Sequence, residues 1–67
     1  MNQLLVDVAL PVPLHQSFTY IVPPDLAQLV RPGSRVLVPF GKKVLSGIVV
    51  GFPSGSSVKT LRPIHDV

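Results

Sequence analysis

Eight prolines and five glycines interrupt this chain of 67 residues, about one interruption for every five residues. Proline has no backbone N–H and glycine weakens regular elements, so such frequent interruption leaves no room for a long helix. The stretches that remain are short and rich in Val, Leu, Ile, Phe and Tyr, as strands are. The spacing of proline and glycine therefore predicts an all-β chain with at most one short helical turn, placed after Asp25.

Apolar residues alternate along these short stretches, which is the pattern of strands with one buried face. In the first stretch, Leu4, Val6 and Val8 share one face, and Asp7 falls on the other. Five stretches qualify as strands: 4–10, 17–22, 34–40, 44–52 and 58–67. A glycine is expected to bend the fourth, and Pro63 is expected to break the fifth or place it at an edge. We therefore expect a single domain over residues 1–67, a small, partly open β-barrel or rolled sheet of five to six strands.

The composition predicts that another part of a larger protein covers some of the apolar surface of this chain. Hydrophobic residues make up 46% of the chain and charged residues only 13%, against about 25% charged in an ordinary soluble domain. A chain of this size buries only about 60% of the surface of its unfolded form. It also has no cysteine to form a disulfide or one of the common zinc sites. We expect the domain to be a piece of a larger protein that packs on its apolar surface.

Membrane and secretory classes are not supported by the sequence. No run approaches the ~18 apolar residues that a membrane span requires. The N-terminal stretch has no basic region and contains Asp7, unlike a signal peptide. The expected location is the cytoplasm, with no membrane partner.

Catalytic motifs are missing as well. The sequence has no Gly-x-Ser-x-Gly turn, and the neighbours His65 and Asp66 would point to opposite faces of a strand. The run Phe40 to Lys43, "FGKK", lacks the remaining positions of a phosphate-binding loop. We therefore expect no catalytic residues, no metal site and no cofactor in this chain.

Aromatic and basic residues are the remaining candidates for function. Phe18 and Tyr20 share one face of a predicted strand, with Thr19 on the other. They could be core residues or a platform for stacking bases, because small barrels use aromatic rings for both. The formal net charge is +3, and the six basic residues are spread along the chain: Arg31, Arg35, Lys42, Lys43, Lys59 and Arg62. They could meet a phosphate backbone or form an evenly solvated surface.

The order of several short motifs resembles a known family. These motifs are "VALPVPL" at 8–14, "FTY" at 18–20, "GSRVLVPFGKK" at 33–43, "GIVV" at 47–50 and "VKTLRPIHDV" at 58–67. Together they are similar to the N-terminal 3′ DNA-binding domain of the bacterial primosomal protein N′ family, the PriA replication-restart helicases. The resemblance implies a non-catalytic module that recognises the 3′ end of the nascent leading strand at a stalled fork. ATP and zinc would belong to the helicase part, and other primosome proteins would bind through the parent protein.

The resemblance also implies a site. Its pocket would contain the "FTY" strand, the glycine of the Pro-Phe-Gly turn and a lysine of the last stretch, which correspond here to Phe18, Thr19, Tyr20, Gly41 and Lys59. An aspartate is common in the family where this chain has Thr19, so the base contact would come from an uncharged hydroxyl. Further contacts to the DNA backbone are expected from Arg35, Lys42, Lys43 and Arg62.

Two other functions remain open at this point. The low charge and apolar surplus also suit a small β-barrel module that binds another protein, with its basic residues serving solubility. A generic binder of single-stranded DNA would have the same composition and would be indifferent to strand ends.

Overall fold

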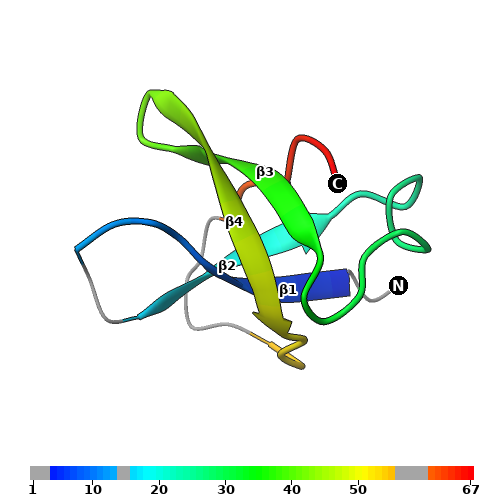
Figure 1. Cartoon of the computed structure of the whole chain (residues 1–67). Coiled ribbons are helices and arrows are strands. Elements are labelled where there is room, and N and C mark those ends of the chain that lie inside the picture. Colours follow the sequence, from blue (N-terminus) through cyan, green and yellow to red (C-terminus); the bar gives the residue numbers. More distant parts are fainter. Residues whose placement is uncertain (1–3, 14–15, 56–60) are drawn as a thin grey trace.

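The structure is a computed structural model, and it describes residues 4–13, 16–55 and 61–67. These residues form one antiparallel sheet of four strands, β1 (Leu4–Ala9), β2 (Ser17–Val22), β3 (Arg35–Phe40) and β4 (Lys43–Gly51). The strand order is β2-β1-β4-β3, and the sheet curls into a half-barrel (Figure 1). The described residues contain no helix. Among them there is therefore no helix that could cross a membrane. Where the sequence predicts a helical turn, residues 24–29 form successive turns.

The concave side of the sheet holds the core, as the alternation predicts. In the β1–β2 pair, Val6 stands opposite Tyr20 and Val8 opposite Phe18, so apolar side chains meet on the same side. The buried residues of the core cluster come from every strand and from segments outside the strands: Val6, Val8, Tyr20, Val22, Val30, Val36, Val38, Val49 and Ile64. Small branched side chains dominate this list, because a tightly curled sheet leaves little volume inside.

A two-residue turn joins β3 and β4, with Phe40 paired to Lys43 across it. Gly41 has a positive φ of 62°, and the following Lys42 does not have a positive φ. This combination is typical of the type II′ hairpin turn, in which glycine takes the first central position. Pro39, paired with Val44, is tolerated because β3 is an edge strand and the missing N–H would point away from β4.

Gly47 in β4 allows the backbones of β1 and β4 to approach closely. A Cβ atom placed there would lie 2.8 Å from the Ala9 carbonyl oxygen and would also overlap the Val8 and Leu10 side chains. Such separations are too short for nonbonded atoms, so only glycine fits without movement of β1. The bend expected at Gly47 or Gly51 stays a prediction, and what requires glycine at position 47 is this close approach.

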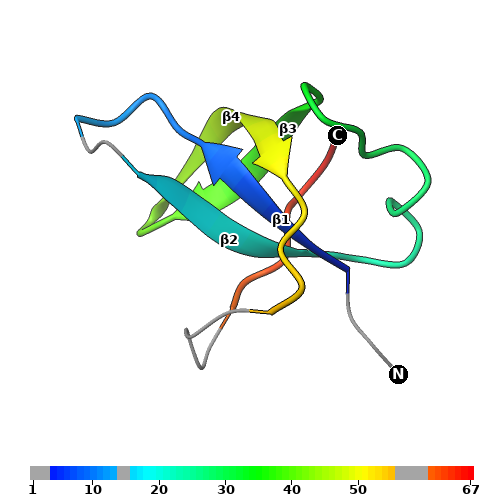
Figure 2. The same cartoon turned by 90° about the horizontal axis from the view of Figure 1, so that it is seen from below.

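Residues 61–67 connect the two edge strands of the half-barrel. The Ile21 N–H donates to the Arg62 carbonyl oxygen, and the Ile64 N–H donates to the Ile21 carbonyl oxygen. At the other edge, the Leu37 N–H donates to Asp66 and the His65 N–H donates to Leu37. Figures 1 and 2 show this segment passing between β2 and β3.

The expected count of five to six strands is not confirmed, because the described residues form four. Residues 61–67 make only isolated bridges, from Pro63 to Ile21 and from Asp66 to Leu37. Pro63 has no N–H to extend a ladder, and the segment leaves β2 after one bridge in order to reach β3. Residues 58–60, the first three of the predicted fifth strand, lie outside the described residues.

Candidate functional site

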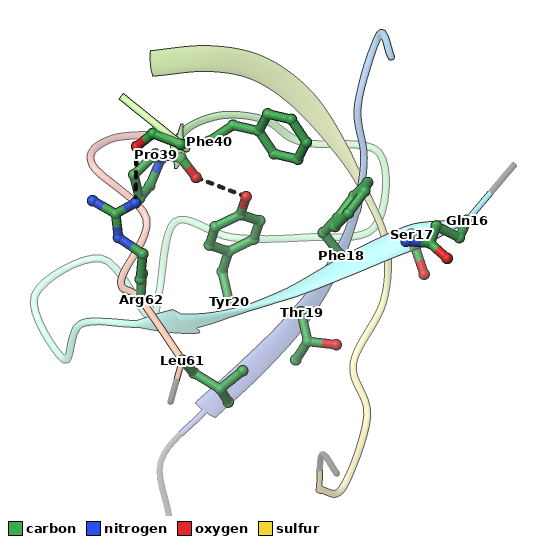
Figure 3. Close-up of a pocket in the computed structure, with 10 residues that line it drawn as sticks. Gln16, Ser17, Phe18, Thr19, Tyr20, Pro39, Phe40, Leu61 and Arg62 are labelled. Atoms are coloured by element: carbon green, nitrogen blue, oxygen red, sulfur yellow. Dashed lines mark hydrogen bonds between the residues drawn. The ribbon is translucent and has the colours of Figure 1, made fainter. Parts of the chain in front are cut away.

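A cavity of about 380 Å³ lies between β2, the end of β3 and the start of the closing segment. This volume is within the range of about 300–1,000 Å³ found for sites that hold small ligands. Figure 3 shows the side chains around it. The lining residues come from three separate parts of the chain: Gln16, Ser17, Phe18, Thr19, Tyr20, Pro39, Phe40, Gly41, Leu61 and Arg62.

The cavity follows the outer edge of β2. Five consecutive residues, 16–20, line it, although successive strand side chains point to opposite faces. Figure 3 shows Thr19 pointing away from the side of β2 that carries Phe18 and Tyr20. The cavity therefore reaches both faces of the strand edge. The backbone N–H and carbonyl groups of Ile21 point to the outer edge of β2, where they bond Arg62 and Ile64. Backbone groups two residues apart in a strand point the same way, so those of Thr19 also face this outer edge.

Two phenylalanines form an apolar wall of the cavity. The rings of Phe18 and Phe40 are packed edge to face, with centroids 5.1 Å apart and planes inclined by 81°. Both side chains are only half-buried, so part of each ring stays accessible. A flat, accessible aromatic surface of this kind is what a nucleobase stacks on.

Tyr20 forms the base of the cavity and belongs to the core. It is 5% exposed, and its hydroxyl donates a hydrogen bond of 2.8 Å to the Pro39 carbonyl oxygen (Figure 3). Burial raises the pKa of the Tyr20 hydroxyl, and the positive charge of Arg62 opposes this in part. Of the two roles that the sequence leaves open for Tyr20, the packing favours that of a core residue with a polar anchor.

Arg62 brings a positive charge to the cavity and fixes the glycine turn. Its guanidinium Nη1 donates to the Gly41 carbonyl oxygen at 3.1 Å, and the side chain is exposed (Figure 3). A guanidinium has five N–H donors, so this bond leaves the others available. Among the described lining residues, Arg62 is the one with a positive charge. The arrangement places an anion-binding group across the cavity from the aromatic wall.

Thr19 is held from the neighbouring strand. Its hydroxyl donates to the Asp7 Oδ1 atom at 2.6 Å, in a partly buried contact between directly opposed residues of β1 and β2. A short bond from a hydroxyl to a carboxylate is among the stronger hydrogen bonds in proteins. The orientation of the Thr19 side chain is therefore fixed before any ligand binds.

The structure brings together most of the predicted site residues. Phe18, Thr19, Tyr20 and Gly41 all line the cavity, and Arg62, expected as a backbone contact, also lines it. Lys59 lies outside the described residues. The other three backbone candidates do not line the cavity: Arg35, Lys42 and Lys43.

Those three lysine and arginine side chains differ in position. Lys42 and Lys43 are exposed and directly follow Gly41, so they stand beside the mouth of the cavity. Arg35 begins β3, whereas the cavity lies at the strand's other end. Phe40 lies five positions after Arg35 along the strand, about 16 Å away at the usual rise per residue. Arg35 is therefore remote from this site.

Sequence reasoning missed five of the lining residues: Gln16, Ser17, Pro39, Phe40 and Leu61. Phe40 alternates with Val36 and Val38 along β3, so it shares its side of the strand with these two core residues. Its position directly before the glycine turn is the signal that could have placed it at the rim of the sheet, where the core face opens.

The site therefore combines an aromatic wall, a glycine turn, a guanidinium and a fixed hydroxyl, and such a set suits a nucleotide. A family model described as "3'DNA-binding domain (3'BD)", that of PriA, matches residues 7–67. The chain belongs to the PriA 3′ DNA-binding domain family. This is a family of DNA-binding domains that occur in replication restart proteins, as the sequence motifs indicate.

Curated relatives carry the name "Replication restart protein PriA". The protein from Haemophilus influenzae is 48% identical over 54 residues, covering 81% of this chain and 7% of its own length. The protein from Buchnera aphidicola (Acyrthosiphon pisum) is 40% identical over 55 residues, covering 82% and 7%. That from Bacillus subtilis is 31% identical over 70 residues, covering 97% and 9%. The chain thus spans less than a tenth of the length of these PriA proteins, and no solved structure gives a significant match.

Proposed function

We propose that this chain is a non-catalytic module that binds the 3′ end of a DNA strand in the cavity along β2. One observation carries the proposal: the Phe18–Phe40 wall, the Gly41 turn and Arg62 all line the same cavity. The terminal base would stack against the wall, and Arg62 would contact a phosphate. Gly41 has no side chain, so the sugar could approach the turn closely.

The proposed recognition of an end is steric. A terminal nucleotide is followed by no phosphate, so the site would accept it and exclude a nucleotide that continues into a chain. Base stacking on an aromatic ring contributes about 1–3 kcal/mol and tolerates any base. Lys59, Lys42 and Lys43 would supply further contacts to the preceding phosphates, and binding would weaken as salt rises.

In the parent protein, this module would hold the 3′ end of the nascent leading strand at a stalled fork for replication restart. The relatives named for replication restart are the support for that role. ATP hydrolysis, zinc binding and contacts to other primosome proteins would belong to the rest of the parent, as would a cytoplasmic location. The module itself would need no cofactor.

A pair of oligonucleotides tests the end-binding proposal. One has a free 3′-hydroxyl, and the other has the same sequence with a 3′-phosphate. Fluorescence anisotropy at low salt should show tighter binding of the free 3′ end, since the added phosphate would have to fit inside the cavity. Equal affinity for the two would contradict end recognition and would favour generic binding of single strands.

Two matched variants locate the site. Phe18→Leu should weaken binding of the free 3′ end, by up to the 1–3 kcal/mol that a stacked base contributes. Phe52→Leu is the control, because Phe52 is exposed and does not line the cavity. Equal affinities for these two variants would place the DNA elsewhere.

A second candidate function is protein binding on the convex side of the β3–β4 hairpin. Four apolar side chains are 40–57% exposed on that side: Leu37, Val44, Ile48 and Val50. Exposed apolar side chains that form a shared surface often bind another protein. The rest of the parent protein would be one partner for this surface. A tight protein complex without any DNA binding at low salt would favour this function over the first.

A further inference from the structure

Asp7 is not among the described residues that line the cavity, but it contacts Thr19, which is. The two residues stand opposite each other in the β1–β2 pair, and the Thr19 hydroxyl donates to Asp7 Oδ1 at 2.6 Å. On its other side, Asp7 is paired with Gly51, which has no side chain to compete for the carboxylate. The register of β1 and β4 shifts directly after Asp7, a type of irregularity that reorients side chains.

This contact determines what Thr19 can offer to a ligand. A threonine hydroxyl has one hydrogen to donate, and Asp7 takes it. The Thr19 Oγ1 atom can then only accept a hydrogen bond. Bonding to a charged carboxylate also increases the negative character of the oxygen, which strengthens it as an acceptor.

We infer that Asp7 is a positioning residue that fixes Thr19 as a hydrogen-bond acceptor, so that the cavity selects a terminal nucleotide that donates a hydrogen bond to Thr19. The inference rests on the proposed function, because it assumes that the nucleotide occupies the cavity that Thr19 lines. The inference adds two points to the proposed function. Thr19 accepts a hydrogen bond from the nucleotide, and Asp7, which is not among the described lining residues, controls this contact.

A terminal nucleotide has two possible sources of the donated hydrogen, the 3′-hydroxyl and an amino group of the base. Three oligonucleotides that differ only in the last nucleotide separate them. The first ends in deoxyadenosine, the second in dideoxyadenosine and the third in the deoxyriboside of unsubstituted purine. The second lacks the hydroxyl donor and the third lacks the amino donor, while all three keep a purine ring for stacking.

For the unmodified chain, we expect one of the two replacements to weaken binding about 3- to 10-fold, as the loss of a single hydrogen bond does. Thr19→Val should abolish this discrimination, and Thr19→Ser should keep it. In Asp7→Ala the Thr19 hydroxyl loses the bond that fixes its orientation and strengthens its oxygen as an acceptor, so discrimination should fall at least about 2-fold.

Asp25→Ala is the matched control for Asp7→Ala. Both variants remove one carboxylate and raise the formal net charge of +3 by one, which changes the general attraction to DNA equally. Asp25 is exposed in the turns that follow β2 and does not line the cavity. It should therefore keep the discrimination of the unmodified chain. Asp7→Asn serves in place of Asp7→Ala if the latter does not fold, and its discrimination should fall at least about 2-fold because the charge is lost.

The outcomes separate this inference from the proposed function. If the chain prefers a 3′-hydroxyl over a 3′-phosphate, and Asp7→Ala or Asp7→Asn discriminates as well as the unmodified chain, only the role of Asp7 is overturned. The same holds if neither replaced nucleotide binds more weakly to the unmodified chain. If the chain does not distinguish the 3′-phosphate, the proposed function fails, and the inference fails with it.

Discussion

The Tyr20 hydroxyl donates a hydrogen bond of 2.8 Å to the carbonyl oxygen of Pro39 and thereby links β2 to β3. These are the two edge strands of the sheet, separated in its order by β1 and β4. The bond crosses the open side of the half-barrel, directly beneath the cavity. A single core tyrosine therefore helps to set the distance between the two walls of the site.

Removal of this hydroxyl should loosen the half-barrel and keep the fold. Tyr20→Phe retains the buried ring and leaves the Pro39 carbonyl without this partner. Urea denaturation should show a loss of about 0.5–1.5 kcal/mol, the usual net value of one hydrogen bond. Unchanged stability would mean that the bond contributes nothing in solution.

Alkaline pH should destabilise the protein through the same group. Burial raises the pKa of Tyr20 above the ordinary tyrosine value of 10.0, so the folded state favours the protonated hydroxyl more than the unfolded state does. The resulting stability is fully present below pH 10 and is lost as the pH rises from there through the folded-state pKa. Denaturation midpoints measured across this range should fall more steeply for the unmodified chain than for Tyr20→Phe. Parallel pH profiles would contradict the assignment.

Gly47 should be the glycine of β4 that tolerates substitution least. In Gly47→Ala the added methyl group would meet the Ala9 carbonyl oxygen and the Val8 and Leu10 side chains. Thermal or urea denaturation should show a loss of about 1–3 kcal/mol, as overpacking usually causes. Gly51→Ala is the control in the same strand, because a Cβ there meets nothing within 4 Å. A similar loss for both variants would point to backbone flexibility as the cause.

Arg62 and Arg35 should differ in their effect on DNA binding. Each variant to alanine removes one positive charge, but only Arg62 lines the cavity. Arg62→Ala should weaken binding of a free 3′ end and reduce the salt slope by about 0.7, the value for one phosphate of a single strand. Arg35→Ala should leave that slope close to the unmodified value. Equal slopes for the two variants would indicate only diffuse attraction to DNA.

The strands and their buried faces were predictable because they depend on local alternation. Val36 and Val38 are fully buried while Leu37 between them is 40% exposed, as a period of two requires. The fifth strand was not predictable in the same way. Residues 61–67 have apolar residues at suitable spacing, but whether they pair along one strand or cross between two depends on where the edges of the sheet lie.

Part of the site could also be read from the motifs. Phe18, Thr19 and Gly41 were placed by their resemblance to a family, and they line one cavity. Phe40 and the bond from Thr19 to Asp7 were not foreseen, because both depend on the pairing register. Asp7 and Thr19 are twelve residues apart and meet only because β1 and β2 pair at those positions.

The amino-acid sequence alone determined the all-β class and the shared faces of Val6 with Val8 and of Phe18 with Tyr20, because backbone sterics and side-chain alternation act over a few residues. Frequent proline and glycine also excluded a long helix at this level. Only the tertiary structure decided that residues 61–67 join both sheet edges and that Arg62 reaches the Gly41 carbonyl oxygen. Those contacts depend on the curl of the sheet, which brings β2 and β3 together and is set by the packing of the whole core.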